Sequence, residues 1–243
     1  MGLAATIQIA DQDVYQQSTV ANSELIGQIA QTSSGLTWMY ANAGGALTAG
    51  QVTQPVAVTA NYATRTLSTG VAAGSNQVTI PLGTTATQNA FVGFWLVVTD
   101  GTGKGQGAYY VTGNTAATAG NSNTTTVSIR GAINIALDNT SVVGLYPSQT
   151  SAITQHTASS AIPVSGVPTI NVTSGNWCWV QTGGYASVLS DQAITKYAMA
   201  IPSASVAGAV TIDLAATVTG AVGYAPELTV DTKYSPLVLT LLT

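Results

Sequence analysis

Only 6% of the 243 residues are Asp, Glu, Lys or Arg, about a quarter of the share in an ordinary soluble domain. The formal net charge is −4 and the five basic residues are scattered, which argues against a nucleic-acid-binding surface because phosphate contacts draw on clustered Lys and Arg. Residues 25–64 and 139–190 contain no charged residue at all. Free monomers normally carry interspersed charges, so we expect other protein to cover much of this surface.

The composition predicts a mainly β protein. Hydrophobic residues make up 46% of the chain but aromatic residues only 7%, so Ala and Val supply much of the apolar content. Val and Thr favour pleated strands because branching at Cβ restricts their χ1 rotation. We therefore expect one or more antiparallel β-sandwich or barrel-like domains, with an extended N-terminal arm and few short helices. The length fits one large or two small domains.

The N-terminal part predicts an arm that leads into a hairpin. Residues 14–30 mix Val, Leu and Ile with Gln and Ser, and both a short helix and an ordered arm remain open there. A turn then connects two expected strands, 27–31 and 36–40. In the second strand, period-two alternation places Trp38 and Tyr40 on one face.

The middle of the chain has the clearest strand pattern. Runs of β-branched and aromatic residues alternate there with clusters of Gly, Asn and Asp. The expected strands are 76–80, 94–99, 108–112, 124–130 and 141–146. Pro81 closes the first of them because proline cannot donate to a strand ladder. The Gly-rich run 100–107 is expected to connect the second and third strands as a hairpin loop with glycines at positive φ.

The last part of the chain predicts a second β region. Residues 149–168 are polar and contain Ser, Thr and Pro, which suggests a linker or an extended segment. Further strands are expected at 176–181, 185–189, 207–214 and 237–242. These patterns divide the chain into 1–60 with the arm and hairpin, 61–150 as a β domain, and 151–243 as the second β region with a C-terminal strand. No strict internal repeat is found.

Few side chains could carry out chemistry. His156, in a polar stretch, is expected to have a surface or hydrogen-bonded role, and Asp11 and Asp13 to be solvated or capping carboxylates. Cys178 lies between two tryptophans in an expected strand, where buried thiols are common. The glycine spacing over 101–107 fits neither dinucleotide- nor phosphate-binding motifs. We therefore expect no enzyme activity, no metal, no cofactor and no nucleic-acid partner. The lack of roughly 20 consecutive apolar residues also argues against a membrane partner.

Two aromatic pairs and the apolar tail are the candidate interaction residues. Alternate aromatic residues on a strand serve core packing, a protein interface or a platform for sugars, and all three roles remain open. An uncharged apolar tail is exposed unless it adds to a sheet, its own or that of a neighbour. The candidate interface residues are therefore Trp38, Tyr40, Trp177, Trp179, Leu237 and Leu239.

Four stretches carry a resemblance to a known class of protein. They are 27–52 (GQIAQTSSGLTWMYANAGGALTAGQV), 98–106 (VTDGTGKGQ), 113–115 (GNT) and 177–184 (WCWVQTGG). In style and order they resemble virion proteins of tailed bacteriophages, in particular capsid decoration or cement proteins and related head proteins. The resemblance implies a β-rich protein on the outer capsid surface that binds the major capsid protein. It also implies self-association as a homotrimer or another symmetric cluster, and no cofactor.

The expected function is therefore that of a structural virion protein that clamps capsomers. A cement protein buries uncharged surface repeatedly and makes symmetric contacts, and small side chains permit strand addition between chains. Residues 1 to about 26 or the C-terminal tail could lace neighbouring copies together. Two alternatives stay open. One is another virion component, such as a head-fibre base, tail or shell protein. The other is a cell-surface adhesin or glycan-binding module.

Overall fold

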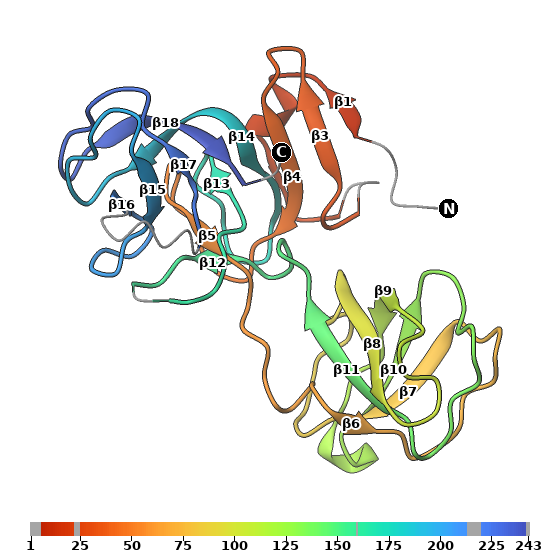
Figure 1. Cartoon of the computed structure of the whole chain (residues 1–243). Helices are drawn as coiled ribbons and strands as arrows, with labels where there is room; N and C mark the ends of the chain where they lie inside the picture. The colour runs from red at the N-terminus through yellow and green to blue at the C-terminus, as the bar shows by residue number, and fades with distance from the viewer. Residues whose placement is uncertain (1–5, 22–24, 159, 213–219, 242–243) are drawn as a thin grey trace. The chain divides into compact units, whose positions relative to one another are not determined.

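The computed structural model describes residues 6–21, 25–158, 160–212 and 220–241 (Figure 1). The chain is mainly β, with antiparallel sheets and one nearly closed, barrel-like sheet, so the predicted fold class is confirmed. It divides into two compact units: unit 1 consists of Met1–Val56 and Gln149–Thr243, and unit 2 of Ala57–Ser148. Unit 2 is thus inserted within unit 1, whereas the sequence patterns suggested three successive regions.

Unit 1 is built on a ten-stranded sheet. From one edge to the other, its main path is β1 (Ile7–Ile9), β3 (Ile29–Thr32), β4 (Thr37–Asn42), β14 (Trp177–Leu189), β18 (Tyr234–Thr240), β17 (Gly223–Tyr224), β15 (Met199–Pro202) and β16 (Val210–Ile212). β1 and β3 are parallel, and every other neighbouring pair on this path is antiparallel. β2 (Gln17–Ser18) and β13 (Val167–Pro168) also pair with β14, while β5 (Thr53–Gln54) and β12 (Thr154–Gln155) pair with each other.

The 13-residue strand β14 holds this sheet together. Its residues from Trp177 to Gly183 pair with β4, and those from Gly183 to Leu189 pair with β18. The two predicted strands 176–181 and 185–189 are therefore one strand. The two glycines between them suggest a break, but Gly184 (φ 85°) allows the strand to continue where a Cβ would lie 2.7 Å from a side-chain carbon of Leu36.

The centre of the unit 1 sheet is buried on both faces. One face of β4 carries Trp38 and Tyr40, and the other carries Met39; each face belongs to a separate hydrophobic cluster. A third cluster, around the second half of β14 and β18, contains Leu237 and Leu239. The hairpin formed by β3 and β4 matches the strands predicted at 27–31 and 36–40, so that prediction is confirmed.

Residues 149–168 run through unit 1 and do not link domains. Thr150 and His156 are fully buried, and the segment contributes the whole of β12 and β13. The Asn42 N–H donates to the Thr150 carbonyl (3.1 Å), and the His156 N–H donates to the Val52 carbonyl (2.9 Å). The linker interpretation is wrong, because neutral hydroxyl side chains cost far less to bury than charges when the main chain around them is paired. The alternative, an extended segment, describes it correctly.

The described N-terminal residues form an ordered arm that folds back on the sheet of unit 1. Its one helical element, η1 (Asp13–Tyr15), is a single 3₁₀ turn whose Val14 side chain is buried. β1 lies beside β3, and β2 pairs with Trp177 and Cys178 at the start of β14. Of the two possibilities predicted for 14–30, the ordered arm is therefore correct for the described part; residues 22–24 lie outside it.

Unit 2 is a six-stranded antiparallel sheet. Its strands, in order across the sheet, are β6 (Arg65–Thr66), β11 (Val142–Pro147), β8 (Phe94–Asp100), β9 (Ala108–Asn114), β10 (Thr124–Ile129) and β7 (Gln77–Pro81). One 3₁₀ turn, η2 (Ala119–Asn121), precedes β10. All five strands predicted in the middle of the chain are confirmed, and only β6 was not predicted.

The two edges of the unit 2 sheet meet, which nearly closes it into a barrel. The Arg65 Nε of β6 donates a hydrogen bond to the Pro81 carbonyl of β7 (2.7 Å), and the Gly83 N–H donates to the Asn61 carbonyl (3.0 Å). Side chains that alternate inward along the strands are fully buried, among them Ile80, Leu96, Val111, Val127 and Leu145. Closure removes most of the open strand edge that would otherwise invite pairing with other chains.

Three nested bridges precede strands in both units. In each, two residues far apart in sequence exchange both main-chain hydrogen bonds, at 2.8–3.0 Å, and are followed by a turn and then a strand. The pairs are Leu47 with Val172, Val71 with Leu137, and Ala86 with Ala117. Each bridge fixes the starting points of two strands at once. The same geometry recurs without a sequence repeat, because each side of a bridge needs only one small or aliphatic residue followed by a turn.

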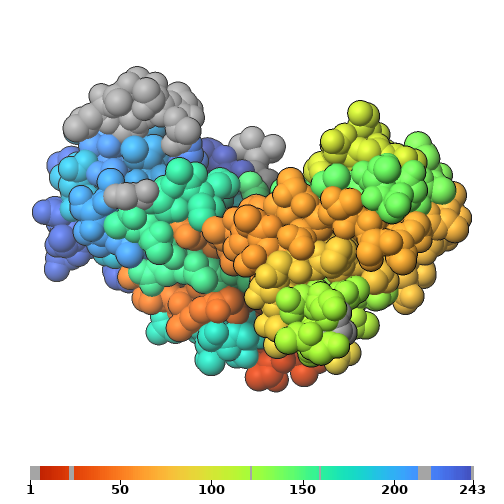
Figure 2. All heavy atoms as spheres, turned by 90° about the horizontal axis from the view of Figure 1, so that it is seen from below, coloured from red at the N-terminus to blue at the C-terminus, as the bar shows by residue number. Residues whose placement is uncertain are grey.

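Residues 57–148 are expected to fold when they are expressed alone. Unit 2 has its own core and a nearly closed sheet, and the residues that enter it, 57–61, are exposed and belong to the orange surface in Figure 2. Thermal unfolding followed by circular dichroism should be cooperative, and the amide NMR spectrum should be dispersed. A broad, non-cooperative transition would show that unit 2 depends on the rest of the chain.

Candidate functional site

The predicted aromatic candidates come together in the interior of unit 1. The Tyr40 ring stacks on Trp177 (centroids 5.8 Å apart) and packs against Trp179 (5.0 Å), while Tyr15 meets Trp38 edge-on (6.3 Å). Trp38, Tyr40 and Trp179 are at most 4% exposed, and Trp177 is half-buried. Among the three roles that the sequence leaves open, core packing therefore describes this cluster in the isolated chain.

The apolar tail is part of the core as well. β18 lies between β14 and β17, so the C-terminal strand adds to the sheet of its own chain. Leu237 and Leu239 are 0% and 2% exposed and face the interior. All six candidate interface residues thus pack within unit 1, five of them buried and Trp177 half-buried, and their role as an interface stays a prediction.

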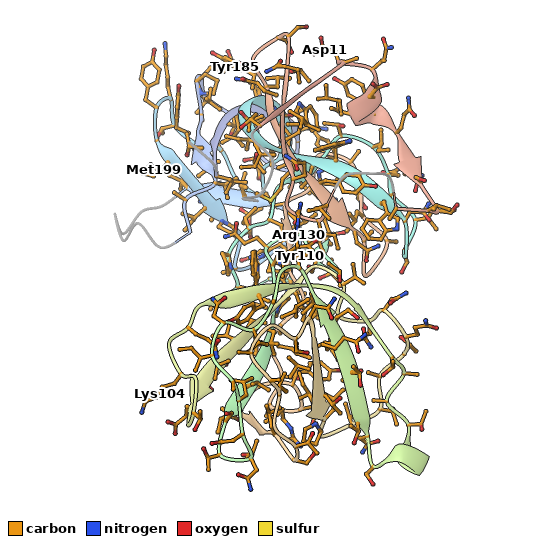
Figure 3. The ribbon with its side chains drawn as sticks, turned by 90° about the vertical axis from the view of Figure 1, so that its right-hand side faces the viewer. Asp11, Lys104, Tyr110, Arg130, Tyr185 and Met199 are labelled. Atoms are coloured by element: carbon orange, nitrogen blue, oxygen red, sulfur yellow. The ribbon has the colours of Figure 1, made fainter. Side chains whose placement is uncertain are left out.

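The outer face of the same strands carries a row of exposed apolar side chains. Tyr185 of β14 pairs with Val238 of β18, and Val238 pairs with Tyr224 of β17. Tyr224 pairs in turn with Met199 of β15. Residues that pair directly across antiparallel strands lie on the same face of a sheet, so these four side chains form a continuous row. Tyr185 is 64% exposed, Met199 39% and Tyr224 38%; Figure 3 labels Tyr185 and Met199. We call the four residues the outer row.

The strands that carry the outer row contain no charged residue. No residue of β14, β15, β17 or β18 is Asp, Glu, Lys or Arg. The next row along the strands, which includes Leu239 and Ala200, faces the core. The outer row therefore offers apolar contact area that the core does not require, as protein interaction sites commonly do. Sequence reasoning missed it because β15 and β17 are short and because register between distant strands leaves no local signal.

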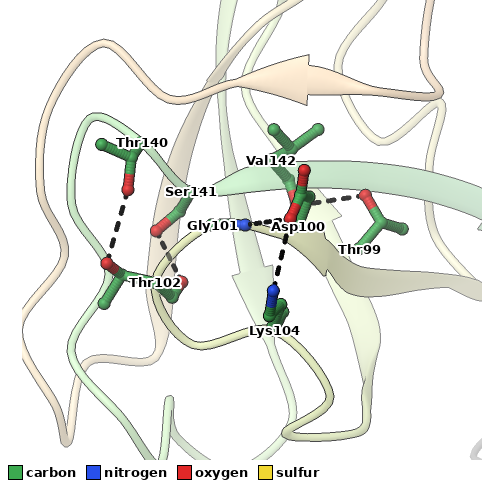
Figure 4. Close-up of polar contacts among 8 residues, drawn as sticks. All are labelled: Thr99, Asp100, Gly101, Thr102, Lys104, Thr140, Ser141 and Val142. Carbon is green, nitrogen blue, oxygen red and sulfur yellow. Dashed lines mark hydrogen bonds and ion pairs between the residues drawn. The ribbon is translucent and has the colours of Figure 1, made fainter.

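In unit 2, residues 101–107 of the Gly-rich run 100–107 connect β8 and β9, and Asp100 is the last residue of β8 (Figure 4). All four glycines have positive φ, at 73°, 82°, 77° and 105° for Gly101, Gly103, Gly105 and Gly107. This confirms the predicted hairpin loop. The Gly101 N–H donates to the Asp100 carboxylate (2.8 Å), so the loop folds onto its own acidic residue.

Hydroxyl contacts fasten this loop to the start of β11. The Ser141 hydroxyl donates to the Thr102 carbonyl (2.7 Å), and the Thr102 and Thr140 hydroxyl oxygens are 3.4 Å apart (Figure 4). Hydroxyls of Thr140 (2.6 Å) and Thr102 (2.7 Å) donate to the Asp138 carboxylate, as does the Thr140 N–H (2.8 Å). These donors, the Thr140 hydroxyl most strongly, lower the pKa of Asp138 to about 2. The loop is a pinned structural turn.

The histidine and the cysteine both have structural surroundings. His156 is 1% exposed, and its Nε2 lies 3.1 Å from the Ile162 carbonyl oxygen, so the hydrogen-bonded role predicted for it is confirmed in a buried position. Burial lowers the pKa of its imidazole. Burial also raises the pKa of the Cys178 thiol to about 12, which leaves almost no thiolate at neutral pH.

The Asp11 carboxylate acts as a local anchor of the arm. Asp11 accepts hydrogen bonds from the hydroxyls of Ser34 (2.7 Å) and Ser33 (2.9 Å), which lower its pKa and tie the arm to the turn between β3 and β4. Asp13 lies in the first turn of η1.

Within the described residues, no three His, Cys, Asp or Glu side chains are grouped closely enough to hold a metal ion. No helix in those residues is long and apolar enough to cross a membrane.

Gly101→Ala should destabilise unit 2 more than Gly105→Ala. Both glycines have positive φ, which costs an alanine about 1–2 kcal/mol. A Cβ at Gly101 would also overlap the Thr140 carbonyl oxygen, whereas a Cβ at Gly105 has no neighbour within 4 Å, so Gly101→Ala should lose about 1–3 kcal/mol more. Denaturant titration of both variants measures the difference. Equal losses would contradict the described loop geometry.

Unit 2 should lose stability between about pH 4 and pH 2 through Asp138. Its folded pKa, about 2, lies below the ordinary value of 3.8, so the carboxylate stabilises the fold above pH 3.8 and this contribution is lost as the pH falls toward 2. Asp138→Asn should flatten the dependence of the melting temperature on pH in this window. The matched control, Asp231→Asn, changes an exposed carboxylate of unit 1 and should leave the pH dependence of unit 2 as in the wild type.

Comparisons of the chain with protein-family models, curated proteins and solved structures found no match.

Proposed function

We propose that this chain is a non-enzymatic structural protein of a virion, which decorates a bacteriophage capsid by binding between capsomers on its outer surface. Its partners are the major capsid protein and further copies of itself in a symmetric cluster such as a trimer. The observation that carries the proposal is the outer row, an exposed apolar surface on strands without charged residues. The resemblance of residues 27–52 and 177–184 to phage head proteins supports the same function.

The physical properties of the outer row suit a contact that is repeated over a lattice. Tyr185 and Tyr224 present large aromatic area with few rotatable bonds, and Tyr is enriched among residues that dominate binding energy. Covering neutral side chains avoids the desolvation penalty that buried charges carry. When several copies are joined in a symmetric cluster, modest contacts add up because later contacts form at high effective concentration.

The chain should therefore be present in purified particles of the virus that encodes it, where electron cryomicroscopy would locate it on the outside of the head. Heads that lack the protein should bind it when it is added back. Replacing two tyrosines of the outer row, Tyr185→Ser with Tyr224→Ser, should weaken that binding by about tenfold or more, because each removes an aromatic contact typical of binding hot spots.

The control for this experiment is Ile135→Ser. Ile135 is 54% exposed and lies in unit 2, outside the sheet that carries the outer row. It should bind heads as the wild type does. Absence of the chain from purified particles, or unchanged binding of the double tyrosine variant, would overturn the proposal.

A further inference from the structure

Unit 1 has a cavity of about 500 Å³ beside β14. It is lined by residues 48–50, by residues between 167 and 171, by residues 186–187 of β14, and by Tyr234 of β18. This volume lies within the roughly 300–1,000 Å³ typical of small-molecule sites. No Asp, Glu, Lys, Arg, His or Cys lines it, so nothing in its wall would neutralise a charged ligand.

Tyr234 forms a flat aromatic wall of this cavity. Its side chain is half exposed, and its ring lies against Gly50, where a Cβ would be 2.6 Å from the ring carbon Cε1. Gly50 has φ 72°, and its carbonyl accepts the Leu189 N–H of β14 (2.9 Å), so the backbone behind the ring is fixed by the sheet. The open ring face carries partial negative charge and attracts weakly positive C–H groups.

Neutral hydrogen-bonding groups surround the aromatic wall. The hydroxyl of Thr169 is buried and has no hydrogen-bond partner within the described residues. A buried polar atom left unpaired is costly and calls for a ligand or a water molecule as its partner. The Asn171 side-chain oxygen accepts the Ala49 N–H (3.0 Å), which leaves its amide N–H groups as donors. Ser187 is exposed, and its hydroxyl makes no hydrogen bond to another described residue, so this hydroxyl faces solvent at the rim of the cavity.

We propose that this cavity binds a neutral saccharide, with the C–H face of one sugar ring against Tyr234 and its hydroxyl groups paired with Thr169, Asn171 and Ser187. A phosphate or nucleotide would require cationic side chains that the wall lacks, and an aliphatic ligand would leave the Thr169 hydroxyl unpaired. Ser187 and Tyr234 lie on the same face of the sheet as the neighbouring outer row, but no residue of that row lines the cavity, and the proposal does not depend on the proposed function.

Saturation-transfer NMR of the full chain tests this directly. The probes are D-glucose, D-galactose, N-acetyl-D-glucosamine, maltose and lactose, each at millimolar concentration. Ring protons of at least one sugar should receive saturation. Thr169→Val removes the buried hydroxyl at nearly constant volume and should weaken binding by roughly tenfold. Tyr234→Leu removes the aromatic face and should abolish the transfer.

Two controls separate a binding effect from a folding effect. Thr240→Val makes the same chemical change on β18 outside the cavity and should bind sugar as the wild type does. Melting curves of all variants should show that each is folded under the conditions of the measurement. The double tyrosine variant of the outer row should also retain sugar binding, which makes failure of this proposal distinguishable from failure of head binding.

The proposal is overturned if none of the five sugars receives saturation from the folded wild type. It is also overturned if folded Thr169→Val and Tyr234→Leu bind sugar like the wild type. If no sugar receives saturation from the folded wild type and Thr169→Val changes the mass of the protein in solution, the cavity holds a segment of a second copy and not a saccharide.

Discussion

Unit 1 depends on the pairing of β14 with two different strands along its length. Its first half binds β4, which precedes unit 2 in the chain, and its second half binds β18, which is the last described strand along the chain. The change of partner occurs at two glycines, because Gly184 adopts a positive φ beside Leu36. The aromatic cluster, the outer row and the cavity beside Tyr234 all take their positions from this one strand. A defect in its register would move every one of them.

Neutral groups in this protein perform tasks that charges perform elsewhere. Threonine and serine hydroxyls hold the carboxylates of Asp138 and Asp11 and lower the pKa of each. Main-chain pairing allows Thr150, Ser151 and Ser165 of the segment 149–168 to be buried. Regions of the surface therefore differ from one another in shape and in exposed aromatic area more than in electrostatic potential. The outer row and the cavity follow this pattern, one as an apolar row and the other as a neutral recess.

Local patterns predicted the fold class, the β3–β4 hairpin, all but one strand of unit 2 and the glycine-rich turn. Alternation and turn chemistry act over a few residues, so they can be read from sequence. The union of residues 1–56 with 149–243, and the pairing that aligns Tyr185, Tyr224 and Met199, depend on contacts between distant segments. The polar composition of residues 149–168 suggested a linker between domains, and that interpretation is wrong because these residues belong to unit 1. The buried positions of Trp38 and Leu237 were among the roles foreseen, whereas the surface residues Tyr185 and Tyr234 left no sequence signal.

The pairing of β5 with β12 gives the chain a modular construction. Gln54 pairs with Thr154 and Thr53 with Gln155, so the two stems from which unit 2 departs and returns are clamped together inside unit 1. A clamp of this kind fixes the spacing of the stems independently of what lies between them, which is the circumstance in which domain insertion is tolerated. During evolution, unit 2 could therefore be replaced by another domain while unit 1 is retained. For the same reason the site suits display of foreign polypeptides whose termini lie close together.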